Sequence, residues 1–175
     1  MSKTFDEIIE ERHSCRMFPF LFDSAPVSDE IISRIVKRID LCPNSFGPHS
    51  FHTYVVTNRD LIEKITSASG QNWVKSAPLL FVFCSECEDS SWGDRAISLW
   101  YIQDAAIAQT YALLAVQEEG LRSCWVGGFD ESKVKKILNI PSHFRPVGIQ
   151  ACGYDKKSRV KKYPRVFEDT FTYCK

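Results

Sequence analysis

The chain has 175 residues, of which 44% are hydrophobic and 25% are charged, a composition typical of one globular domain and not of a disordered chain. Its 22 basic and 22 acidic side chains balance, so no overall charge favours nucleic acid or an anionic membrane. The seven scattered cysteines are an odd number, no signal-peptide pattern is present, and no apolar run approaches the roughly 20 residues that cross a bilayer. We therefore expect one domain, residues 1–175, in a reducing cytoplasm.

The first predicted element is an amphipathic helix over residues 4–13, where apolar side chains recur at helical spacing. It ends in the basic cluster "ERHSCR" at 11–16, which should be presented in a turn. A second helix, capped by Ser28, ends before a Cys-Pro pair. The segment "PNSFGPHS" at 43–50 predicts a structured loop that leads into a strand at 51–56.

The rest of the chain alternates between helical and strand patterns. The predicted elements are a helix at 60–69, a strand at 79–84, a long helix at 95–119 ended by Gly120, a strand at 123–126, a helix at 131–138 and a strand at 146–154. Four or five strands interleaved with helices indicate one sheet domain of the α/β or α+β class. We find no linker, repeat or low-complexity segment that would divide it.

Three segments have the residue types that bind an anion: "RHSCR" at 12–16, Gly127-Gly128, and "KKYPR" at 161–165. Arginine, serine hydroxyl and backbone N–H groups together recognise phosphate well, and glycines allow a ligand to approach the backbone closely. The alternatives are ordinary: solvated cations at helix ends, and a simple turn. The chain has neither a G-x-G-x-x-G pattern nor a P-loop, so a phosphate would be held in another way.

Other catalytic patterns are weak in this sequence. Cys84 and Cys87 have C-x-x-C spacing, which fits a zinc half-site, a redox pair or simply two reduced thiols, and no second C-x-x-C follows. The four histidines lack a helical i, i+4 pair, and no serine lies in a G-x-S-x-G turn. We therefore predict no metal site. The sequence remains compatible with an enzyme whose bound cofactor carries out the chemistry.

Taken in order, these segments resemble a known family over nearly the whole chain. The segments that carry the resemblance are "RHSCR", "CPNSFGPHSFHTYVV", "AP" before a buried strand, "DAAIAQTYALLAVQEEGL", "CWVGGFD", "PVGIQACGY" and "KKYPR". Each motif is degenerate, but their order and spacing are similar to those of the FMN-dependent nitroreductase family.

The resemblance implies an α+β nitroreductase-like fold, a central mixed sheet flanked by helices, assembled as a homodimer with FMN at the interface. The segment "AAIAQTYALLA" would lie in the interface helix, although the sequence alone fits an ordinary buried helix equally well. The implied activity is a ping-pong reaction in which NADH or NADPH delivers a hydride to FMN and a nitroaromatic, quinone or related acceptor then receives it. No side chain is required as an obligate acid or base.

The family's binding residues map onto this chain one by one. Arg12, His13 and Ser14 would bind the phosphate and ribityl region, and Arg16 would lie at the pyrimidine edge, where its charge would favour the reduced ring. The further positions implied are Pro43, Asn44, Ser45 and Gly47 in the loop along the flavin, Gln71 and Asn72 as amide contacts, and Gly127 and Gly128 near N5 and O4. At the phosphate, the implied positions are Arg165 and, less securely, Lys162 or Lys161.

The loop at 43–51 departs most clearly from the family pattern. Gly47 replaces the usual Asn, His49 the Gln, Ser50 the Pro and Phe51 the Trp, and the lid region and C-terminal arm are short. These departures keep three alternatives open: another flavin-dependent reaction (dehalogenation, dehydrogenation or flavin cleavage), a flavin-binding protein without useful turnover, and a globular interaction domain that binds no flavin.

Overall fold

The computed structural model describes residues 3–18, 25–45, 50–89, 91, 93–155 and 172–174. Its elements, in chain order, are α1 (Phe5–Glu11), α2 (Asp29–Ile39), β1 (Phe51–Val56), α3 (Arg59–Ser69), the 3₁₀-helix η1 (Asn72–Ser76), β2 (Leu79–Glu86), the π-helical turn η2 (Ala96–Trp100), α4 (Tyr101–Glu118), β3 (Arg122–Val126), α5 (Glu131–Leu138) and β4 (Phe144–Gly153). None of the helices in these residues is long and apolar enough to span a bilayer.

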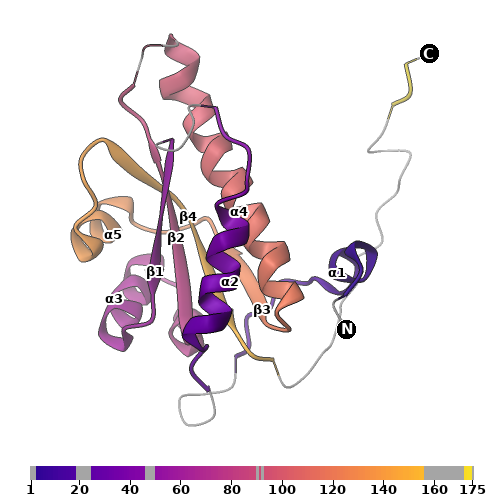
Figure 1. Cartoon of the computed structure of the whole chain (residues 1–175). Coiled ribbons are helices and arrows are strands. Elements are labelled where there is room, and N and C mark those ends of the chain that lie inside the picture. Colours follow the sequence, from indigo (N-terminus) through magenta and orange to yellow (C-terminus); the bar gives the residue numbers. More distant parts are fainter. Residues whose placement is uncertain are drawn as a thin grey trace.

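The four strands form one sheet in the order β1-β2-β4-β3 (Figure 1). All three pairings are antiparallel, and the sequence had predicted a mixed sheet. In the described part of the chain, the parallel contribution is a single bridge between Ser14 and Ser123 at the outer edge of β3. The predicted α+β class is confirmed.

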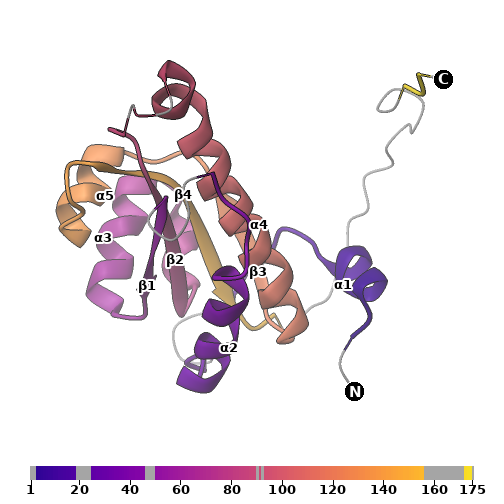
Figure 2. The ribbon, with the colours of Figure 1, turned by 45° about the horizontal axis from the view of Figure 1, so that its top comes forward.

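Helices cover both faces of the sheet (Figures 1 and 2). On β2, Leu79, Phe81 and Phe83 pack toward α2 and α4. Leu80, Val82 and Cys84 point the other way, toward α3 and α5. Successive side chains of a strand normally alternate between its two faces in this way. Because both faces of the sheet are covered, the sequence of β2 is a continuous apolar run. Each such side chain stabilises the fold by about 1.5–3 kcal/mol.

Most element boundaries agree with the sequence predictions, and two differ. The predicted helix at 4–13 ends earlier, at Glu11, because Arg12 takes an extended conformation with φ −62° and ψ 125°. The predicted helix at 95–119 begins instead with the π-helical turn η2 before α4. The sequence did not predict η1, because a five-residue 3₁₀-helix is too short to show an apolar period.

The long helix α4 lies very close to the sheet. Four alanines face the core: Ala105, Ala108, Ala112 and Ala115. Between them the fully buried Gln109 amide donates to the Ile149 carbonyl at 3.0 Å and to Gln150 Oε1 at 3.2 Å. A Cβ atom at Gly148 would lie only 2.0 Å from Gln109 Oε1. The glycine is therefore required for this helix to approach the strand.

We predict that Gly148→Ala destabilises the protein by about 1–3 kcal/mol, because the new methyl group displaces a buried, hydrogen-bonded amide. Urea unfolding of the wild type and the variant measures this loss. The matched test repeats the substitution in a Gln109→Ala background, where the methyl group meets no amide. An equal loss in both backgrounds would contradict the assignment of the clash to Gln109.

Candidate functional site

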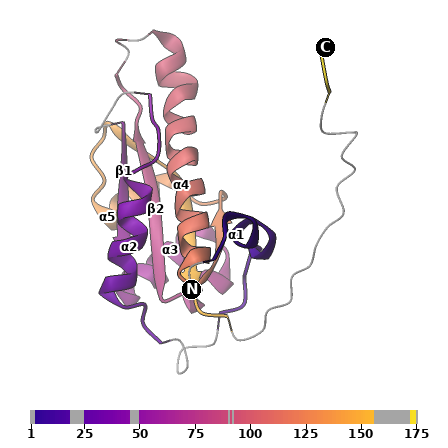
Figure 3. The same ribbon diagram turned by 45° about the vertical axis from the view of Figure 1, so that its right-hand side comes forward.

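A short segment, residues 12–18, follows α1, which lies beside α4 (Figure 3), and it contacts the outer edge of β3 at Ser14 and Cys15. Ser14 forms the parallel bridge to Ser123, and the Cys15 N–H donates to the Ser123 carbonyl at 3.0 Å. In an extended segment successive side chains point to opposite sides. Alternate residues of the basic cluster are therefore separated into two groups.

The first group, Arg12, Ser14 and Arg16, faces the Cys124 side of β3. Burial raises the pKa of the Cys124 thiol. The charges of Arg16 and Arg12 act in the opposite direction and lower that pKa, as does the Ser14 side chain, so all three lie near this thiol. Ser14 and Arg16 are exposed and Arg12 is half-buried. Within the described ranges, neither arginine forms an ion pair with a carboxylate.

The second group points the other way. His13 Nδ1 lies 3.1 Å from the Glu11 carbonyl oxygen, and its Nε2 lies 3.7 Å from Asp155 Oδ2. Burial, with a smaller contribution from the charge of Asp155, raises the pKa of Cys15 on the same side. His13 alternates with Arg12 and Ser14 along the segment, and its predicted contact with a cofactor stays a prediction.

The predicted glycine pair lies at the far end of β3, between Val126 and the N-cap of α5. The Asp130 N–H donates to the Ala68 carbonyl at 2.9 Å, which fixes this turn against α3. A Cβ atom at Gly128 would meet nothing within 4 Å among the described residues, whereas one at Gly127 would lie 3.9 Å from Trp125 Nε1. Gly127 is four residues, or about 13 Å, beyond Ser123 along the strand.

The bridge fixes the direction of the segment at one point. Because Ser14 pairs in parallel with Ser123, the chain runs in the same direction as β3 there. Further along, the Phe18 side chain lies beside Gly153, which pairs with Arg122, the first residue of β3. The segment therefore leaves the edge of β3 after the bridge, and the order of Arg12 and Arg16 relative to the glycine pair stays a prediction.

Of the two amides predicted near this site, Gln71 contacts the glycine pair. Its Nε2 donates to the Gly128 carbonyl at 3.3 Å, and its Oε1 accepts from Trp73 Nε1 at 3.1 Å. Asn72 is the exposed first residue of η1. The contact of Asn72 with a ligand stays a prediction, and Gln71 is the better placed of the two.

The predicted loop residues Pro43, Asn44 and Ser45 lie elsewhere, beside the start of α4. Ser45 donates twice to Asp104 Oδ1, from its backbone N–H and from its hydroxyl, each at 2.9 Å. Asp104 Oδ2 and Asn44 Oδ1 are buried and have no hydrogen-bond partner within the described residues. The sequence reasoning missed Asp104, although it is a lone carboxylate inside an otherwise apolar helical run.

The two groups of predicted residues are far apart within one chain. Glu11, immediately before Arg12, contacts Gln117 near the end of α4, whereas Ser45 contacts Asp104 near its start. Thirteen residues of helix separate Asp104 from Gln117, which is about 20 Å. One chain therefore does not bring loop 43–45 together with the arginine segment.

Some predicted residues lie outside the described ranges, namely Gly47, His49, Lys161, Lys162 and Arg165. Their roles stay predictions. The other two residues that depart from the family pattern, Ser50 and Phe51, lie at the sheet. Phe51 is the first residue of β1, and the Ser50 carbonyl accepts a hydrogen bond from the Glu86 N–H at 3.0 Å.

Comparison with known proteins identifies the family of this chain. A sequence model of the nitroreductase family matches residues 9–154, which include the arginine segment, α4 and the glycine pair. The chain belongs to the nitroreductase family. An oxygen-insensitive NADPH nitroreductase from Helicobacter pylori is 28% identical over 166 residues, covering 75% of this chain and 78% of that protein. The predictions of this family and of an oxidoreductase are confirmed.

Solved nitroreductases share the fold. One from Clostridium difficile, named as FMN-dependent, has a TM-score of 0.80 at 23% identity and covers 97% of this chain and 98% of that chain. A nitroreductase from Bacillus subtilis has a TM-score of 0.86 at 21% identity and covers 97% of this chain and 73% of its own. These likenesses show that the chain has the nitroreductase fold, and in this chain Ser14 and Cys15 contact the outer edge of β3.

The C-x-x-C pair of this nitroreductase lies apart from that edge. Cys84 is fully buried in β2, and burial raises the pKa of its thiol to about 12. The Cys87 thiol donates to the His143 carbonyl at 3.3 Å, and burial raises its pKa as well. No group of three or more metal-ligating side chains occurs among the residues that the structure describes. The interpretation as two reduced, unreactive thiols is favoured.

We predict that iodoacetamide at pH 8 modifies the exposed Cys174 first, and Cys84 and Cys152 only after unfolding, because the thiolate is the reactive form. Peptide mass spectrometry over a time course follows each site. The urea-unfolded protein, in which all seven cysteines should react, is the control. Rapid modification of Cys84 or Cys87 in the native protein would instead support a redox or metal-binding pair.

Proposed function

We propose that this nitroreductase-family chain is an FMN-dependent NAD(P)H oxidoreductase that reduces nitroaromatic, quinone or related acceptors. The observation that carries the proposal is that Arg12, Ser14 and Arg16 all lie near the Cys124 thiol of β3, the strand that ends at the glycine pair. The names of the relatives, an NADPH nitroreductase and an FMN-dependent nitroreductase, support the donor and the cofactor.

The residues at this edge fit FMN. Arg12 and Ser14 would hold the phosphate dianion by charge-assisted hydrogen bonds, joined by Lys162 and Arg165 from the C-terminal segment. Arg16 would lie at the pyrimidine edge, and the backbone N–H groups of Gly127 and Gly128 would serve as donors to the ring. The open space beside Gly128 leaves room for a planar group there.

When bound, FMN supplies the redox chemistry: it takes a hydride from NADH or NADPH and then reduces the acceptor in a ping-pong cycle. The protein's own contribution is binding, orientation and electrostatics. The Arg16 guanidinium supplies a fixed positive charge where negative charge accumulates on reduction. Ser14 and the glycine N–H groups supply oriented donors, and no side chain is required to transfer a proton.

We further propose that two copies of the chain form a homodimer, each supplying loop 43–45 to the other's arginine segment. The separation of about 20 Å between these groups within one chain supports this assembly. Two apolar side chains of α4, Ile102 at 39% and Tyr111 at 38% exposed, are also accessible to a second copy of the chain.

A cytoplasmic location is proposed because all seven cysteines are free. Disulfides form and persist in oxidising compartments, whereas thiols stay reduced in the cytosol.

The visible spectrum of the purified protein tests the proposal directly. We expect flavin absorbance bands that bleach under anaerobic addition of NADH or NADPH, and steady nucleotide oxidation with menadione or a nitrofuran. Bound flavin without turnover would indicate a flavin-binding protein. A colourless protein that does not take up added FMN would refute the proposal.

The two arginines are expected to differ in effect. Arg12→Ala should raise the Kd for FMN about tenfold or more, through loss of a charge-assisted contact to the phosphate. Arg16→Ala should make the reduction potential of bound FMN about 30–60 mV more negative, because the reduced form loses its counter-charge. Flavin fluorescence titration and anaerobic dye equilibration measure these quantities. Lys37→Ala, on exposed α2, is the control, and an unchanged potential in Arg16→Ala would reject its role.

The dimer is tested by Ile102→Glu, which places a charge on the exposed side of α4. We expect a folded monomer in sedimentation velocity and a Kd for FMN at least about tenfold higher, because a buried unpaired charge opposes association. Lys64→Gln, which removes one positive charge from α3 on the opposite face of the sheet, should leave both properties unchanged. A variant that stays dimeric, or a monomer that retains FMN, would contradict the shared site.

A further inference from the structure

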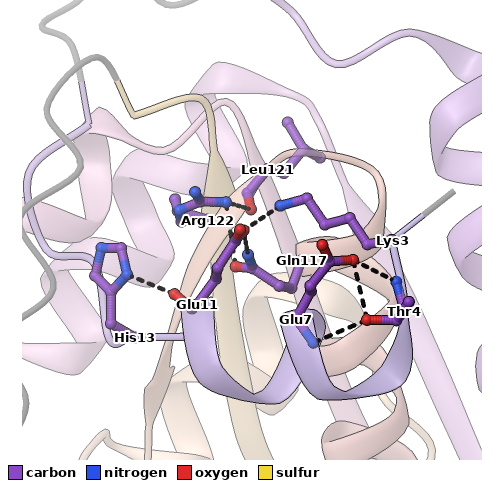
Figure 4. Close-up of polar contacts among 8 residues, drawn as sticks. All are labelled: Lys3, Thr4, Glu7, Glu11, His13, Gln117, Leu121 and Arg122. Atoms are coloured by element: carbon purple, nitrogen blue, oxygen red, sulfur yellow. Dashed lines mark hydrogen bonds and ion pairs between the residues drawn. The ribbon is translucent and has the colours of Figure 1, made fainter. Parts of the chain in front are cut away.

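A network of polar contacts surrounds Glu11, the residue immediately before Arg12 (Figure 4). The Glu11 carboxylate pairs with Lys3 and accepts a hydrogen bond from Gln117 Nε2 at 3.2 Å. Its backbone carbonyl oxygen lies 3.1 Å from His13 Nδ1. Glu11 is therefore held at both its side chain and its backbone, where helix α1 gives way to the arginine segment.

Gln117 uses both ends of its amide in this network. It is 2% exposed and lies in the last turns of α4. Its Nε2 donates to Glu11, and its Oε1 accepts from Arg122 Nη1 at 3.1 Å. Arg122 Nη1 also donates to the Leu121 carbonyl at 3.0 Å. A carboxylate on one side and a guanidinium on the other allow only one orientation of the amide.

Little else fixes α1 to the rest of the protein. The helix projects from one side of the molecule in all three ribbon views (Figures 1, 2 and 3). Ile8 is its buried residue, whereas Phe5 and Ile9 are 63% and 48% exposed. The polar contact between Glu11 and Gln117 is thus a main connection between this helix and α4.

We propose that Gln117 is a positioning residue for the phosphate-binding arginine Arg12. The buried Gln117 amide holds Glu11, and the bridge to Ser123 holds Ser14. Arg12 therefore lies between two fixed points of the chain. Without the amide, Arg12 would sample positions away from the phosphate, and its binding energy would be reduced by the entropy of ordering it. This inference rests on the proposed binding of FMN.

The chemistry of the pair allows a sharp set of variants. In Gln117→Glu two carboxylates face each other, and the repulsion should displace Glu11. Glu11→Gln alone keeps an acceptor for Gln117 and should have little effect. In the double variant Glu11→Gln/Gln117→Glu, the new amide at position 11 can donate to the new carboxylate at position 117. That carboxylate can still accept a hydrogen bond from Arg122. The net charge of the protein is the same as in the wild type.

The experiment measures the Kd of the purified apoprotein for FMN and for riboflavin, which lacks the phosphate. In Gln117→Glu we expect the Kd for FMN to rise about tenfold while that for riboflavin changes less than about twofold. The double variant should recover FMN binding to within about threefold of the wild type. Gln117→Met, which removes both hydrogen bonds without adding charge, should also weaken FMN, and Glu11→Gln should not rescue it.

Each outcome has a definite meaning. An equal loss for both flavins would show a general structural role and overturn the positioning role, as would failure of the double variant to recover. Circular dichroism identifies a variant that does not fold, and Gln117→Met then decides in place of Gln117→Glu. A wild-type protein that binds neither flavin would refute the proposed function itself. A Gln117 variant with the same ratio of FMN to riboflavin Kd values as the wild type would refute only the positioning role.

Discussion

The close packing of α4 against the sheet determines where every part of the candidate site lies. Four alanines and the contact between Gln109 and Gly148 bring the helix near the strands, and a buried amide is hydrogen bonded there to β4. Small residues and the two hydrogen bonds donated by the Gln109 amide nitrogen fix both the distance and the position of the helix along the sheet. A helix fixed in this way gives its two ends defined places, and both ends carry site residues.

At each end of α4, a buried polar side chain holds a neighbouring segment by hydrogen bonds. At the start of α4, a buried carboxylate, Asp104, holds a loop through two donors of Ser45. Near its end, a buried amide, Gln117, holds Glu11 and with it the segment that contains Arg12. In each case a buried polar group holds a neighbouring segment that carries predicted site residues, through hydrogen bonds that offset the cost of burying the group.

The fold and the arginine segment could be predicted from the sequence because they depend on local patterns. The continuous apolar run of β2, the cap at Ser28 and the glycine pair each carry a signal within a few residues. The partners of Gln117 and the separation of His13 from Arg12 could not be predicted, because they depend on residues that are distant in sequence. The resemblance to the family supplied functions for single positions. It did not indicate that Ser45 and Arg12 lie at opposite ends of one helix.

That separation has a thermodynamic consequence for the proposed dimer. A ligand that contacts the arginine segment of one copy and loop 43–45 of the other binds only to the associated pair, so ligand binding and association stabilise each other by mass action. FMN retention should then depend on protein concentration, falling on dilution below the dissociation constant of the dimer. Conversely, saturating FMN should lower the concentration at which the dimer dissociates, and the two effects must be equal in free energy because they share one thermodynamic cycle.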